Sequence, residues 1–196
     1  MNKHTVLFID GENFMHKVQE VLYRQKIDQT NLDVSKIKLN DLFSRALNGM
    51  PITRKIFYAA RLHEHKETKE KSKELIKFQR SLKTELEKQG FEFIIAGNVR
   101  AQTISDHGKS TTTFREKGVD VRIAVDLVSL ACDHALDTAV LCSSDSDLQP
   151  AITEVKKREV NVIYLGFEMN PNKGLIYTTN RAILLRNSEI VDAVRS

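Results

Sequence analysis

The chain has 196 residues, of which 41% are hydrophobic and 29% are charged, a composition that supports a folded core and excludes an intrinsically disordered protein. No apolar run approaches the roughly 18 residues of a membrane-spanning helix, and the run at residues 6–9 is too short for the core of a signal peptide. We therefore predict a cytoplasmic protein with no membrane contact, folded as a single domain over residues 1–196. The net charge of +4 favours a polyanionic partner only weakly.

The first half of the chain alternates predicted strands with predicted helices. We predict strands at residues 6–9, 54–60 and 91–95. Apolar residues recur at helical spacing directly after residue 10, in a short segment from Asp41, and in a long charged segment at about 66–89. Residues 27–40 are polar and weakly periodic, so we expect a loop there.

Residues 98–116 differ from the rest of the chain because they alternate in the β manner around a turn sequence. That sequence, Asp106-His107-Gly108-Lys109, contains the glycine and aspartate typical of tight turns. We predict a β-hairpin that is inserted in the domain and projects from it.

The second half continues the alternation. We predict a helix from Val119 to about Asp133, a strand at 138–142, a helix from Asp147, a strand at 160–165 and a last strand at 182–185. The apolar positions of the first of these helices include Val121 and Val125, and residues from about 167 form a C-terminal extension. Cys132 and Cys142 have apolar neighbours and are predicted to be reduced core residues. The order of elements predicts an α/β, Rossmann-like three-layer sandwich with a mainly parallel central sheet and helices on both faces.

Acidic residues lie where this fold would place a ligand site. Asp10 follows the first predicted strand, Asp145 and Asp147 follow the strand at 138–142, and Asp120 begins a helix. Ligands of parallel sheets bind beyond the carboxyl ends of the strands. Carboxylates gathered there repel one another unless a cation neutralises them, and oxygen ligands suit Mg²⁺ or Mn²⁺. Hydrolysis of phosphodiester bonds is the chemistry that matches such a site.

A structural role for the same residues is the alternative. Asp120, Asp145 and Asp147 each stand where a carboxylate can cap the helix that follows, although none has the glutamate or glutamine of a capping box. Asp10-Gly11 alone is compatible with a turn. For any single aspartate the two interpretations are equally supported, and the combination of three acidic clusters favours a site.

Three ordered segments carry a resemblance to a known family. These are residues 6–13, residues 117–121 together with Asp126, and residues 143–148. In order and spacing they resemble the NYN domain, which belongs to the PIN-like nuclease superfamily and includes the LabA-like proteins. The similarity extends over roughly residues 5–166.

The resemblance implies a PIN-like fold and a metal-dependent ribonuclease, with endonucleolytic cleavage expected. Asp10, Asp120, Asp145 and Asp147 match the acidic positions, as catalytic residues and as ligands of Mg²⁺ or Mn²⁺. Asn13 matches an asparagine that orients a ligand or water, and Ser143 matches the hydroxyl residue that opens the last segment. Asp126 matches a recurrent acid, but it lies about 120° around the helix from Asp120, so its role is supporting or structural.

The sequence departs from the family pattern in three places. Ser144 stands where glycine is frequent, Leu148 where phenylalanine is frequent, and Thr179-Asn180 where an Ala-Asp pair is frequent. These changes bear on the catalytic rate rather than on the fold.

Basic residues near the expected site predict contact with single-stranded RNA. Arg61 follows the second predicted strand, and the others lie in or beside the hairpin: Arg100, Lys109, Arg115 and Lys117. Such cations can neutralise the phosphates that flank a scissile bond. A solvated surface is the equally supported alternative, and a protein partner or a second copy of this chain is the alternative occupant of the hairpin.

Two other functions compete with the nuclease. A phosphatase of the haloacid dehalogenase type, acting on a small phosphoester, requires Asp-x-Asp after the first strand, and Phe8 occupies the position of the first of these aspartates. A non-catalytic RNA-binding or regulatory module with a PIN-like fold is the second, and the presence of all four matched acids argues against it.

Overall fold

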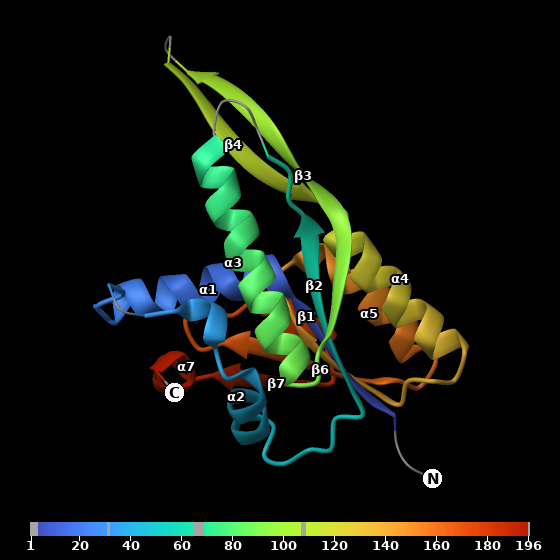
Figure 1. Ribbon diagram of the computed structural model, residues 1–196. Helices are drawn as coiled ribbons and strands as arrows, with labels where there is room; N and C mark the ends of the chain where they lie inside the picture. Colours follow the sequence, from blue (N-terminus) through green and yellow to red (C-terminus); the bar gives the residue numbers. More distant parts are fainter. Residues whose placement is uncertain (1–3, 31, 65–68, 107–108, 196) are drawn as a thin grey trace.

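The computed structural model of the protein describes residues 4–30, 32–64, 69–106 and 109–195, with the backbone alone for residues 100–116. These residues form a seven-stranded sheet in the order β4-β3-β2-β1-β5-β6-β7 (Figure 1). The strands are β1 (Thr5–Asp10), β2 (Arg54–Arg61), β3 (Glu92–Asp106), β4 (Lys109–Lys117), β5 (Thr138–Cys142), β6 (Asn161–Phe167) and β7 (Arg181–Leu185). Within this sheet β4 pairs antiparallel with β3, and the other pairs are parallel.

The central strands are apolar on both sides because helices cover both faces of the sheet. All six residues of β1 are buried, and Phe8 pairs with Ile56 on one side and Leu141 on the other. Leu7 and Ile9 belong to one hydrophobic core, whereas Phe8 belongs to a second core on the opposite face. The three-layer α/β fold predicted from the sequence is confirmed.

The helices divide between the two faces according to these cores. One face is covered by α1 (Gly11–Arg24), α2 (Leu39–Ala46), α3 (Lys69–Lys88) and α7 (Asn187–Arg195). The other is covered by α4 (Val119–Cys132), α5 (Gln149–Lys156) and α6 (Lys173–Thr178). The segment after residue 167, predicted as an extension, therefore contributes β7 to the sheet and the buried side of α7 to a core.

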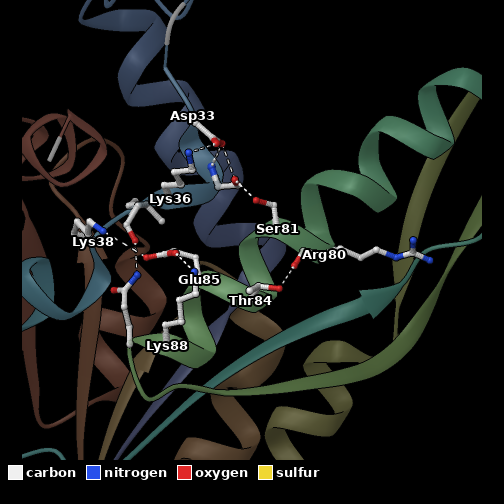
Figure 2. Close-up of polar contacts among 11 residues, drawn as sticks. Asp33, Lys36, Lys38, Arg80, Ser81, Thr84, Glu85 and Lys88 are labelled. Carbon is white, nitrogen blue, oxygen red and sulfur yellow. Dashed lines mark hydrogen bonds and ion pairs between the residues drawn. The ribbon is translucent and has the colours of Figure 1, made fainter.

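The predicted loop at 27–40 contains a short 3-10 helix, η1 (Val34–Lys36), and is attached to α3 by polar contacts (Figure 2). Asp33 accepts hydrogen bonds from the backbone and hydroxyl of Ser35, and the Ser35 hydroxyl lies 2.8 Å from that of Ser81. Lys38 and Glu85 form an ion pair of 3.4 Å. Partly exposed pairs of this kind contribute at most about 1 kcal/mol, so their effect is to fix the position of the segment.

The predicted hairpin is formed by β4 and the outer half of β3, and Figure 1 shows it extending beyond the rest of the sheet. Its turn residues, His107 and Gly108, lie outside the described part of the chain. Gly97 and Gly118 stand at its base with φ angles of 72° and 95°. A Cβ on Gly97 would lie 2.2 Å from the carbonyl oxygen of Lys117, so the two strands can approach this closely only because that side chain is absent.

The prediction that Cys132 is a core residue was wrong, and the way in which α4 is buried explains why. Its buried positions include Val119, Ile123 and Leu127, while Val121 and Val125 are 60% and 53% exposed. Cys132, at the end of the same helix, is exposed, in contrast to the buried Cys142. Because α4 carries apolar residues around most of its circumference, hydrophobic periodicity does not show which side meets the sheet.

Candidate active site

The acidic residues meet where the direction of chain winding reverses. From β1 the sheet grows through β2 and β3 on one side and through β5, β6 and β7 on the other. At such a reversal the connections leave neighbouring strands toward opposite faces and open a crevice at their carboxyl ends. Asp10 is the last residue of β1, and Asp145 and Asp147 follow β5.

Three of the predicted ligands lie together. Among the described residues, Asp120, Asp145 and Asp147 each offer a carboxylate oxygen, and these oxygens all lie within 4.8 Å of one another. Asp120 and Asp145 are half-buried and Asp147 is exposed. Asp120 comes from the first turn of α4, whose N-cap is Gly118, so it does not cap its own helix. Gly118, at the base of the hairpin, is therefore followed almost directly in the chain by Asp120, a member of the cluster.

Asp10 lies beside the cluster, with its carboxylate engaged in hydrogen bonds. It is 3% exposed, and it accepts from the backbone N–H of Asn13 at 3.2 Å, from the side-chain amide of Asn13 at 2.6 Å and from the hydroxyl of Ser143 at 3.1 Å. Burial raises the pKa of Asp10, the hydrogen bonds from Asn13 and Ser143 oppose that shift, and the charge of Asp145 adds to it. Since the folded state then binds the proton more tightly, this residue lowers stability as pH rises above its ordinary pKa.

Hydrogen bonds join the loop after β1 to the loop after β5. Ser143 donates to Asp10 and accepts from the backbone N–H of Asp145 at 3.1 Å. Ser144 donates to the side-chain oxygen of Asn13 at 2.8 Å. Asn13 thus bridges Asp10 and Ser144, and Ser144 supplies at this position a hydroxyl that glycine would lack.

Two of the aspartates also cap helices, which the structural alternative predicted for Asp145 but not for Asp10, where it predicted a turn. Asp10 caps α1 through the bond from Asn13, and Asp145 caps η3 (Ser146–Leu148) by accepting from the backbone N–H of Asp147 at 2.9 Å. That bond uses one oxygen of Asp145 and leaves the other free among the described residues. Capping and membership of the cluster are therefore compatible, because capping fixes the carboxylate without occupying both oxygens.

Asn172 supports this loop from behind and was missed in the sequence. Its side chain donates to the carbonyl of Ser144 at 2.9 Å and accepts from the backbone N–H of Leu175 at 3.0 Å, and its backbone N–H donates to the hydroxyl of Tyr164 at 3.1 Å. The available signal was an asparagine before a short apolar segment, which is typical of a helix N-cap. Its contact with Ser144 depends on tertiary structure, so no local sequence pattern predicts it.

Asp126 is not one of the three clustered acids, and its hydrogen bonds go to other residues. It accepts from the hydroxyl of Tyr58 at 2.9 Å and from Arg122 at 2.8 Å, and burial raises the pKa of Tyr58. The bond from Tyr58 attaches α4 to β2, and the pair with Arg122 lies within α4. They support Asp120 through the position of the helix rather than by direct contact.

Of the predicted RNA-binding residues, the structure describes the side chains of two. Arg61 and Lys117 are exposed, and both pair with Asn98, from opposite sides, in the sheet register. They therefore lie on strands about 10 Å apart at the base of the hairpin. Arg100, Lys109 and Arg115 are in the hairpin strands, and their side chains lie outside the described part of the structure.

The parallel sheet with carboxylates at its winding reversal defines an α/β domain of the PIN-like class. Residues 4–186 match the NYN domain family, and the chain belongs to that family. The narrower assignment to the LabA-like proteins remains a prediction. The crystal structure of a protein of unknown function from Vibrio parahaemolyticus is similar, with a TM-score of 0.52, 18% sequence identity and coverage of 93% of each chain, a likeness that concerns the fold alone.

We found no match to the chain among curated protein sequences. Within the described residues, no helix combines the length and apolar character needed to cross a membrane.

Proposed function

We propose that the protein is a metal-dependent ribonuclease that hydrolyses phosphodiester bonds of single-stranded RNA. The observation that carries this proposal is the group of three carboxylates, Asp120, Asp145 and Asp147, at the carboxyl end of the sheet. Membership of the NYN family supports it, since PIN-like domains are typically ribonucleases. We propose the activity for the whole chain as one domain, because residues after 167 complete the sheet.

The donor set suits a hard divalent cation such as Mg²⁺ or Mn²⁺. Oxygens around one octahedral cation at about 2.1 Å lie about 3 to 4 Å apart, and the three carboxylate oxygens approach that spacing. When bound, the cation would polarise the phosphoryl group and lower the pKa of an attacking water. Asp120, Asp145 and Asp147 would hold it, while the hydrogen bonds of Asp10 and Asn13 fix the geometry of the loops. Asp10 also adds a carboxylate beside the cluster.

The direct test is cleavage of RNA by the purified protein. Labelled single-stranded RNA with Mn²⁺ is expected to yield shorter products, and a chelator is expected to prevent their formation. Product lengths distinguish cleavage within the chain, which we expect, from removal of terminal nucleotides. Absence of any Mn²⁺-dependent product would contradict the proposal.

The Asp120→Asn variant is expected to be more stable than the wild type in chelator, by about 1 kcal/mol. The carboxylates of Asp145 and Asp147 have oxygens within 4.8 Å of an oxygen of Asp120. At that distance each of the two repulsions destabilises the folded state by about 0.9 kcal/mol even in water. The favourable effect of an acid in the first turn of a helix is about 0.5 kcal/mol, so removal of the repulsion dominates.

In the presence of Mn²⁺ we expect the wild type to be more stable than Asp120→Asn. At a concentration one hundred times its dissociation constant, a ligand stabilises the wild type by about 2.7 kcal/mol, and Asp120→Asn should lose most of that gain. Thermal melts with Mn²⁺ and with chelator measure both effects. Asp133→Asn, an exposed acid at the other end of α4, is the control, and an equal Mn²⁺ response in the two variants would exclude Asp120 as a ligand.

RNA is expected to reach the site along the hairpin. The double variant Arg100→Ala, Arg115→Ala should bind RNA more weakly and with a shallower salt dependence, by about one unit of slope for each phosphate that is no longer neutralised. Its Mn²⁺-dependent stabilisation should be unchanged. The control removes two exposed cations, Lys157 and Arg158, after α5, where the chain has returned to the opposite end of the sheet.

If the hairpin variant binds RNA as the wild type does across the salt titration, the hairpin does not guide RNA. A protein partner or a second copy of the chain would then be its occupant. Sedimentation of the wild type and the variant distinguishes these two outcomes.

A phosphatase that uses Asp10 as nucleophile is disfavoured by the environment of that residue. Asp10 is 3% exposed, and both of its oxygens accept hydrogen bonds. A nucleophilic carboxylate needs an oxygen that is free to attack the substrate.

A further inference from the structure

A groove between α4 and α5 begins at the carboxylate cluster. Its volume is about 430 Å³, within the range of small-ligand sites. Asp120 and Asp147 form one end, and the remaining wall is mainly aliphatic. The aliphatic residues are Val121, Ala124, Val125, Val128 and Ala151.

The exposure of two valines on this wall is the feature that needs an explanation. Val121 and Val125 are 60% and 53% exposed, and they lie one helical turn apart, directly after Asp120. Leaving large apolar groups in water is unfavourable, and adjacent exposed apolar residues are typical of binding surfaces. Neither valine is part of the hydrophobic cores.

We infer that this groove binds the nucleoside adjoining the scissile phosphate, with its base and ribose against Val121 and Val125. The inference rests on the proposed ribonuclease function. Among the described side chains, the lining contains no cation, so these residues do not favour an occupant that is itself a phosphate. Because Asp120 and Asp147 line one end of the same groove, a nucleoside joined to the scissile phosphate can place its base and ribose on the apolar wall and its phosphate at the cluster.

A protein occupant fits the same surface less well. A helix or a second copy of the chain that covered Val121 and Val125 would also cover Asp120 and Asp147, since all four line one groove. It would close the cluster to a polymeric substrate. Val125 lies only about 5 to 6 Å along the helix axis beyond Val121, a reach that a single nucleotide can span.

The chemistry of the wall also predicts the selectivity of the subsite. Aliphatic side chains can contact the faces of all four bases. Of the residues that the structure describes in the lining, one offers a side-chain hydroxyl, Ser129, besides the two carboxylates. Recognition by apolar contact is tolerant of base identity. The subsite therefore requires a base without selecting which one.

The experiment measures Mn²⁺-dependent cleavage of an RNA with one cleavage site, together with versions in which single nucleotides lack their base. The variants are Val121→Ser, Val125→Ser and, as control, Tyr23→Ser, which changes an exposed residue at the far end of α1. For the wild type, removal of one base adjoining the cleaved bond should lower kcat/KM about fivefold to tenfold. The variant that combines Val121→Ser with Val125→Ser should lose a similar factor on intact RNA and nothing further when that base is absent. The control should behave as the wild type.

Three results would overturn the inference. The first is an active wild type that is insensitive to every missing base beside the cleaved bond. The second is that removal of the base lowers kcat/KM by the same factor in the wild type and in the valine variant. If light scattering also shows that the variant loses a dimer, the groove is an interface between copies. The third is a wild type that cleaves no RNA, which contradicts the proposed function itself and is distinguished from the first two by the intact substrate.

Discussion

The Asp145→Asn variant is expected to cleave RNA at least about a thousandfold more slowly than the wild type, with its fold unchanged. Asp145 is within 4.8 Å of both other acids in the cluster, so loss of its charge weakens the hold on a cation and on the developing transition state. A thousandfold loss corresponds to about 4 kcal/mol. Asparagine is as good an N-cap as aspartate, so the bond from the backbone N–H of Asp147 is retained.

This substitution separates the two roles of Asp145. Cleavage is measured with labelled RNA and Mn²⁺, and the fold is checked by circular dichroism and thermal melting. Asp133→Asn makes the same change of charge at an exposed position and should remain fully active. A variant at Asp145 that is as active as the wild type would show that the cluster does not carry the reaction. A variant that melts far below the wild type in chelator would show that the charge of Asp145 stabilises the fold, and would favour a structural role for this residue.

The Gly11→Ala variant is expected to lose about 3 kcal/mol or more of folding free energy. A Cβ at this position would lie 2.3 Å from a ring carbon of Phe57 and 2.4 Å from the carbonyl oxygen of Tyr58. The carbonyl belongs to the backbone of β2, so relief requires a shift of α1 against the sheet, and overpacking of this kind typically costs about 1–3 kcal/mol and sometimes more. For a chain of this length the melting temperature should fall by about 6–12 °C.

Gly174→Ala is the matched control for this substitution. Its Cβ would approach the end of the flexible side chain of Gln149 at 2.9 Å, and alanine favours the helical conformation of α6. Its melting temperature should stay within a few degrees of the wild type. If Gly11→Ala also melts with the wild type, the junction of β1 and α1 has room for a methyl group, and the glycine after Asp10 has no steric role.

Chain direction and strand burial were enough to predict the fold and the end of the sheet where the acids gather. Continuous apolar runs identify strands covered on both faces, and a residue that follows such a strand lies at its carboxyl end. That reasoning located Asp10, Asp145 and Asp147 without knowledge of contacts. It did not distinguish Asp10, with its three hydrogen bonds, from the three acids that lie together.

The parts that could not be predicted depend on packing between distant segments. Asn172 reaches the site through a bond to Ser144, 28 residues earlier, and no local pattern encodes such a contact. Helix α6 was missed because it has only 6 residues, too few for a clear helical periodicity; α7, with 9 residues, was also missed. The exposed side of α4 could not be predicted because valines lie on several sides of this helix.

The pairing of β1 with β5 has a consequence for synthesis of the protein. Asp10 and Ser143, joined by a hydrogen bond, are 133 residues apart in the chain, and the clustered acids lie at positions 120, 145 and 147. A nascent chain that has reached only the end of β4 contains Asp10, Asn13 and the hairpin but none of those three carboxylates. Closure of so long a loop is also among the slower steps of folding. The nascent chain of this proposed ribonuclease therefore lacks the carboxylate cluster while it is on the ribosome. The cluster can form only after the last third of the chain has been added and has paired with β1.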